Sequence, residues 1–80
     1  MREILINLNS INNVKSFNEV IAQFDCDVDL ISENRRYVID AKSIMGIFSL
    51  DLSKNITLRI HDDGALADSI VAAVDKYIVK

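Results

Sequence analysis

Side chains that could carry out acid–base or nucleophilic chemistry are few in this chain. His61 is the single histidine and precedes Asp62 at the end of a predicted strand, so it is either a general base oriented by a carboxylate or a solvated loop residue. We favour the solvated loop residue. Cys26 alternates with Val28 and Leu30, which predicts a small side chain turned into the core rather than a nucleophile.

Three aspartates alternate along the same stretch. Asp25, Asp27 and Asp29 would lie about 7 Å apart on one face of a strand, and no glycine turn follows them to wrap a divalent cation. A solvated strand face is therefore a simpler interpretation than a metal site. The chain also lacks a glycine-rich phosphate loop, a Gly-x-Ser-x-Gly elbow and an HExxH helix. We expect no cofactor, no metal and no enzymatic activity.

The segment from Lys42 to Leu50, KSIMGIFSL, is the most informative part of the chain. It carries more apolar side chains than a short helix can turn inward, so we expect some of Ile44, Met45 and Phe48 to stand at the surface as a patch that docks a partner. The alternative is a short buried connector. Ser43 precedes the predicted helix as its N-cap, and a phosphate on its hydroxyl would meet free backbone N–H groups. Unmodified capping is the simpler role of this serine.

Alternation of apolar and polar residues predicts the strands that position these side chains. The predicted strands cover residues 3–8, 25–31, 35–41 and 55–60. The second and third of them are joined by the turn residues Ser32, Glu33 and Asn34, which predicts an antiparallel hairpin.

Steps of three and four residues between apolar positions predict the helices. One helix begins at Ile11 with Ser10 or Asn12 as its N-cap, a second begins at Ala65, and a short one covers residues 44–48. Gly46 lowers the helix propensity of the short one by about 1 kcal/mol, so its position needs a structural reason. The order of elements predicts an antiparallel or mixed sheet with helices on one face and water on the other.

Length and composition indicate one small globular domain over residues 1–80, since half of the 80 residues are hydrophobic and 26% are charged. The net charge of -3 argues against nucleic acid as a direct partner. No apolar run is long enough for a membrane span or a signal peptide, so we expect no membrane insertion. The single cysteine fits a reducing compartment, and we expect a cytoplasmic protein.

The segment KSIMGIFSL resembles the regulatory-serine segment of HPr, the small phosphocarrier of the bacterial phosphoenolpyruvate-dependent sugar phosphotransferase system. Residues 24–28 and 56–60 resemble the second and fourth strands of that family, and Asp63-Gly64 with the helix over 68–74 resembles its C-terminal element. The resemblance implies an α+β fold, the open-faced β-sandwich βαββαβα, with a four-stranded antiparallel sheet and helices on one face.

The resemblance also implies roles for individual residues. Ser43 falls on the serine that HPr kinase/phosphorylase modifies in Gram-positive bacteria, and Ile44, Met45 and Phe48 fall on the surface that docks protein partners. Carrier members of the family bear phosphate on a histidine within Gly-Ile/Leu-His-Ala-Arg-Pro. An ungapped count places Ser10 at that histidine and Asn12 at the arginine. Because a serine phosphate is an ester of low transfer potential, Ser10 is not expected to replace the histidine.

Three functions follow from this resemblance. The first, which we favour, is a regulatory protein similar to catabolite-repression HPr, switched at Ser43 and docking HPr kinase/phosphorylase or a catabolite-control transcription regulator. The second is a phosphocarrier with a non-standard acceptor such as His61. The third is an unmodified competitor for the HPr docking surfaces of phosphotransferase components. The residue that accepts phosphate, if any, distinguishes these three.

Overall fold

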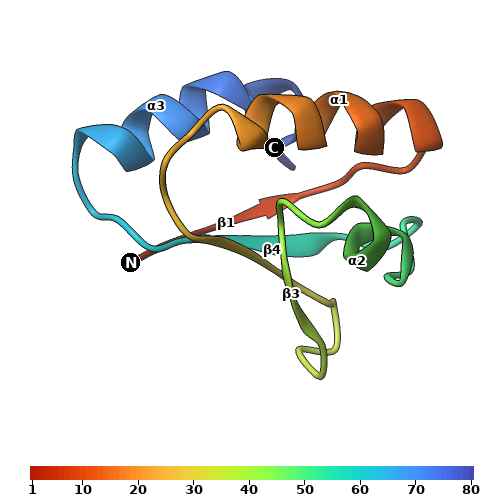
Figure 1. The fold of residues 1–80 in the computed structure, drawn as a ribbon. Helices are drawn as coiled ribbons and strands as arrows, with labels where there is room; N and C mark the ends of the chain where they lie inside the picture. Colours follow the sequence, from red (N-terminus) through yellow and green to blue (C-terminus); the bar gives the residue numbers. More distant parts are fainter.

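The computed structural model describes all residues from 1 to 80 and has the predicted element order, followed by one short 3-10 helix (Figure 1). The predicted α+β class, βαββαβα, is therefore confirmed. The elements are β1 (Arg2–Ile6), α1 (Ile11–Ala22), β2 (Val28–Ile31), β3 (Val38–Asp40), α2 (Ile44–Phe48), β4 (Ile56–Ile60), α3 (Ala65–Ala73) and the 3-10 helix η1 (Asp75–Tyr77).

The four strands form one sheet in the order β1-β4-β2-β3, and every neighbouring pair is antiparallel. Helices α1 and α3 cover one face of this sheet, and α2 packs at its end against α1 and β3 (Figure 1). The other face is open, as the alternation of polar residues predicts. On that face the Arg59 Nε donates to Glu3 Oε2 across 3.0 Å.

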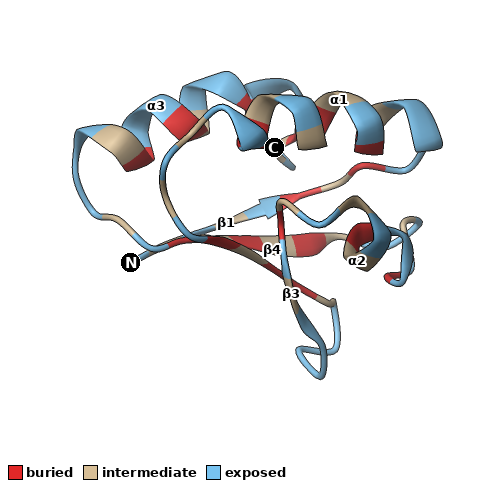
Figure 2. Ribbon diagram, in the orientation of Figure 1, coloured by how far each residue is buried: buried red, intermediate tan, exposed pale blue.

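The core lies between the sheet and the two longer helices (Figure 2). Strand β4 buries every second residue, which is the period expected of a strand with one wet face. From α1, Phe17 is fully buried and meets the Tyr77 ring edge-to-face, with ring centroids 5.8 Å apart. No helix has the length and apolarity needed to cross a bilayer.

Several predicted boundaries are wrong by a few residues. Strand β2 begins at Val28 rather than at residue 25, and β1 ends at Ile6 rather than at residue 8. The hairpin turn is longer than predicted because Ser32 N–H bonds Tyr37 O at 2.9 Å, which leaves only three residues for β3. The apolar stripe from Leu66 to Ile78 predicts one long helix, but α3 ends at Ala73 and the chain then returns along β1, where Ile6 pairs with Ile78.

Candidate functional site

Ser43 is the N-cap of α2. Its backbone is extended (φ -91°, ψ 103°), its carbonyl accepts from the Ile47 N–H at 3.0 Å, and its Oγ accepts from the Gly46 N–H at 3.2 Å. The residue is exposed, and its Oγ accepts only one hydrogen bond. The predicted cap is therefore present, and its hydroxyl is accessible to a modifying enzyme.

The apolar residues of α2 divide between core and surface (Figure 2). Ile47 is fully buried, whereas Met45 is 78% exposed and Phe48 is 40% exposed. Ile44 is half-buried and packs at the edge of the core. Exposing a methionine and a phenylalanine side by side on one short helix is unfavourable in water, and such surfaces commonly contact other proteins. The alternative of a wholly buried connector does not describe this helix.

The close packing of α2 against β3 explains why a glycine stands inside this short helix. A Cβ at this position would stand 3.3 Å from Ile39 Cδ1 and 3.3 Å from Ser43 Oγ. The glycine therefore lets α2 approach β3 closely while the Ser43 hydroxyl stays on the Gly46 N–H.

The beginning of α1 is uncharged. Of the two predicted candidates, Ser10 rather than Asn12 is its N-cap, and the Ser10 Oγ accepts from the Asn13 N–H at 3.1 Å. The preceding Asn9 takes a left-handed conformation (φ 41°), which asparagine tolerates better than most residues. Ile11 is 61% exposed, and the periodicity did not single it out as a surface residue. Ile11 is the first residue of α1 and lies three residues before Val14, the first buried residue of the helix.

His61 lies on the open face of the sheet, away from α1. Its Nε2 is 2.6 Å from Asp29 Oδ2 on the neighbouring strand, and both side chains are about one-third exposed or less. His61 is exposed in the bend after β4, as the favoured interpretation predicts, but its imidazole has a partner, and that partner is Asp29 rather than Asp62. The reason is the sheet register, which pairs β2 with β4 and brings together residues 32 apart in the chain.

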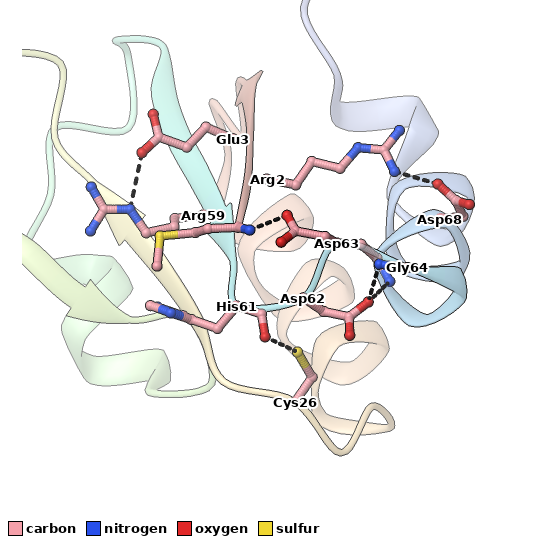
Figure 3. Close-up of polar contacts among 11 residues, drawn as sticks. Arg2, Glu3, Cys26, Arg59, His61, Asp62, Asp63, Gly64 and Asp68 are labelled. Atoms are coloured by element: carbon pink, nitrogen blue, oxygen red, sulfur yellow. Dashed lines mark hydrogen bonds and ion pairs between the residues drawn. The ribbon is translucent and has the colours of Figure 1, made fainter.

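Asp62 and Asp63 have structural partners (Figure 3). The Asp62 Oδ2 accepts from the backbone N–H groups of Gly64 and Ala67, each at 2.9 Å, and so caps the start of α3. Asp63 pairs with the N-terminal ammonium of Met1. These two carboxylates therefore fasten the loop after β4 rather than serve His61.

Cys26 is half-buried and lies outside any strand, which corrects its predicted place in β2. Its Sγ faces the carbonyl oxygen of Asp27 at 3.5 Å. It also faces the carbonyl oxygen of His61 at 3.8 Å (Figure 3). Burial raises the pKa of the Cys26 thiol, and the charges of Asp62 and Asp27 raise it further. The protonated thiol is a poor nucleophile, in agreement with the prediction from sequence.

The aspartate comb predicted on β2 does not form. Asp25 and Asp27 precede the strand, and only Asp29 lies within it, where it meets His61. No group of three or more histidine, cysteine or acidic side chains converges in a way that could hold a metal ion.

One pocket, of about 340 Å³, lies between the hairpin turn and the loop after α2. Two of its lining residues bond each other, since the Ser32 hydroxyl donates to Asn34 Oδ1 at 2.7 Å. The lining Asp51 is engaged by Ser53 outside the pocket: its Oδ1 accepts from the Ser53 hydroxyl at 2.7 Å and from the Ser53 N–H at 3.0 Å, which lowers the pKa of Asp51. Ser43 does not line this pocket, so the Ser43 region is an exposed surface and not a cleft.

Comparisons with known proteins agree with this geometry. The fold is similar to HPr-C-His from Thermoanaerobacter tengcongensis, with a TM-score of 0.75 and 23% identity over 95% of this chain and 89% of that one. It is also similar to the histidine-containing phosphocarrier protein of a mycoplasma, with a TM-score of 0.70 and 18% identity over 94% of this chain and 86% of that one. No curated protein sequence matches.

The family comparison covers most of the chain. A model described as the PTS HPr component phosphorylation site matches residues 10–80, which include both Ser43 and α2. The matched region also includes the start of α1 and all of α3. This chain therefore belongs to the HPr family, the phosphocarrier domain of the phosphotransferase system.

Proposed function

We propose that this HPr-family protein is a regulatory member rather than a histidine phosphocarrier, with Ser43 as its phosphate switch. The observation that carries the proposal is the exposed N-cap residue Ser43, which lies two residues before the exposed Met45 of α2. The proposed partners are HPr kinase/phosphorylase and a catabolite-control transcription regulator, which would dock on Ile44, Met45 and Phe48.

The modification is a phosphoryl transfer from ATP. The Ser43 Oγ forms a bond to the γ-phosphorus as the bond from that phosphorus to the β,γ-bridging oxygen breaks, ADP leaves, and the hydroxyl proton passes to a base of the kinase. The Gly46 N–H, which now donates to the Ser43 Oγ, is placed to donate to the ester or phosphate oxygens afterwards. The added charge would stand beside Met45 and change what this surface binds.

The beginning of α1 supports a non-carrier role. Ser10 occupies the N-cap, and the first turn after it carries Ile11, Asn12 and Asn13, none of which is charged. A phosphoryl group held at a helix start is normally stabilised by a cationic side chain as well as by backbone N–H groups. His61, the chain's single histidine, is engaged with Asp29 on the other face of the sheet.

The test is intact-mass spectrometry with site mapping after two separate incubations, one with ATP and HPr kinase/phosphorylase and one with phosphoenolpyruvate and enzyme I. We expect one phosphate on Ser43 with the kinase alone. Ser43→Ala should abolish it, and Ser49→Ala is the matched control because Ser49 is an exposed serine at the other end of α2. An acid-labile phosphate under enzyme I would instead make the protein a carrier.

The exposure of Met45 and Phe48 also favours a second function that needs no phosphate. In that case the protein competes with HPr for docking surfaces on phosphotransferase components. Titrating it into a phosphotransfer reaction between enzyme I and a carrier HPr would then slow the reaction. Met45→Glu should remove that inhibition, whereas a wild-type protein that leaves the rate unchanged argues against competition.

A further inference from the structure

The turn that leads into Ser43 has a hydrogen-bond partner for each of its main-chain polar groups at residues 42 and 43. The Lys42 N–H bonds Asp40 Oδ1 at 2.9 Å, and the Ser43 N–H bonds the Asp40 carbonyl at 2.9 Å. The Ser43 carbonyl accepts from Ile47. These bonds are local, formed within the turn and α2, and they leave the Lys42 carbonyl to be satisfied from elsewhere.

The partner of the Lys42 carbonyl comes from α1. The Asn18 Nδ2 donates to Lys42 O at 3.0 Å, in a part-buried contact between residues 24 apart in the chain. It is the single hydrogen bond that this carbonyl receives. Asn18 is polar, half-buried and in the middle of a helix, where an asparagine side chain is unfavourable unless it has a specific partner.

A second bond joins the turn before α2 to the chain just after α1, and here Lys42 is the donor. The Lys42 Nζ donates to the Phe24 carbonyl at 2.7 Å, two residues after the last residue of α1. The lysine side chain is thereby directed toward the end of α1, where a cation is favourable because free carbonyls point outward. Lys42, immediately before Ser43, is therefore bonded through its main chain to α1 and through its side chain to the residues that follow α1.

We infer that Asn18 and Lys42 are positioning residues for Ser43: they fasten the turn before α2 to α1 and so fix the orientation in which the serine hydroxyl is presented. The effect on phosphorylation rests on the proposed function. The effect on the geometry of the Ser43 cap does not, because the Gly46 N–H reports that geometry directly. With either bond removed, the turn loses its fixed relation to α1, and the local bond from the Gly46 N–H to Ser43 Oγ opens more often.

The test compares Asn18→Leu, which removes the donor and keeps the volume, and Lys42→Met, which removes the ammonium and keeps the stem. Gln23→Ala is the matched control because Gln23 is an exposed amide side chain at the end of the same helix. Amide hydrogen exchange of Gly46 should speed up about tenfold in the two variants, as expected for losing one part-buried hydrogen bond, while the control and the amides of β4 stay unchanged. Unchanged exchange of Gly46 in both variants would overturn the inference.

Steady-state phosphorylation by HPr kinase/phosphorylase provides the second readout. We expect kcat to fall on the order of tenfold in both variants with KM within about twofold, since the docking residues remain in place. Faster Gly46 exchange with unchanged kcat would make the two bonds purely structural and would overturn the positioning role. If wild-type protein receives no phosphate, the proposed function fails, and the exchange result alone decides whether Asn18 and Lys42 set the Ser43 cap.

Discussion

Gly46 lies against Ile39 so closely that a Cβ at position 46 would stand 3.3 Å from the Ile39 Cδ1. The same Cβ would stand 3.3 Å from Ser43 Oγ, the atom that caps α2. Two contacts therefore limit the size of the side chain at position 46, one with Ile39 of the sheet and one with the Ser43 cap.

Gly46→Ala tests this relationship. Alanine would add about 1 kcal/mol of helix propensity, but displacing the Ser43 hydroxyl would remove a cap worth about 1 kcal/mol. We expect a change in unfolding free energy below about 1 kcal/mol, together with reduced phosphorylation of Ser43. Chemical denaturation and mass spectrometry measure the two effects. A clear gain in stability with normal phosphorylation would mean that Ser43 and Ile39 accommodate the methyl group.

Met45→Glu separates docking from folding. Because Met45 is 78% exposed, the unfolding free energy should change by no more than about 0.5 kcal/mol, whereas binding to a partner should be lost. Ile47→Ala is the contrasting variant, since the fully buried Ile47 should cost about 2–5 kcal/mol. Thermal denaturation and pull-down with HPr kinase/phosphorylase provide the measurements. Strong destabilisation by Met45→Glu would place this side chain in the core.

Ser10→Ala tests the role of the residue at the start of α1. Loss of the bond from the Asn13 N–H to Ser10 Oγ should lower the unfolding free energy by about 1 kcal/mol. Phosphorylation of Ser43 should be unchanged, because Ser10 contributes only a cap in our proposal. Denaturant midpoints and kinase assays on the same preparation check both statements. Loss of a phosphate acquired from enzyme I in this variant would show that Ser10 accepts phosphate after all.

Arg35 adopts a left-handed backbone (φ 60°) in the hairpin turn. For a residue with a branched or long side chain that conformation costs about 1–2 kcal/mol, and the exposed ion pair of Arg35 with Glu3 at 3.6 Å returns about 0–1 kcal/mol. Asparagine tolerates the conformation better, so Arg35→Asn should raise the unfolding free energy by about 0.5 kcal/mol. Arg36→Asn, at a neighbouring exposed residue without positive φ, is the control and should not.

Cys26 should react slowly with alkylating reagents. Since burial and two aspartates raise the pKa of its thiol, the protonated form persists to higher pH in the folded protein than in the unfolded chain. A raised folded pKa favours the folded state at neutral pH, and that contribution is lost as pH rises beyond the ordinary thiol value of about 8.5. The iodoacetamide rate measured from pH 7 to 10 should therefore show its midpoint above that value. A midpoint below it contradicts the assigned environment.

Much of the fold could be predicted from the sequence because its elements follow local patterns. The stripe containing Val14, Phe17 and Ile21 defined α1, and the alternation in residues 56–60 defined β4, since each pattern lies within one element. Ser10 and Ser43 are predictable as cap candidates for the same reason: each hydroxyl oxygen accepts from the N–H three residues later. Strand ends were less accurate because they depend on the partner strand.

Side-chain partnerships distant in sequence were not predictable. The sequence favours a solvated loop residue at His61 and offers orientation by Asp62 as the alternative, yet the antiparallel register of β2 and β4 brings it to Asp29. The role of Asn18 is not predictable from the sequence. An asparagine outside the apolar stripe of a helix is expected to face solvent, and its partner, the Lys42 carbonyl, is 24 residues away in the chain.

The sequence by itself therefore determined the element order, the two caps and the apolar surplus of residues 44–48, all of which arise from neighbours along the chain. The tertiary structure alone decided which of those apolar side chains stay outside, with Met45 exposed and Ile47 buried, and how α1 holds the turn before Ser43. The physical reason is that burial and long-range hydrogen bonds depend on which surfaces come into contact when the helices pack on the sheet. Patterns within one element do not specify those contacts.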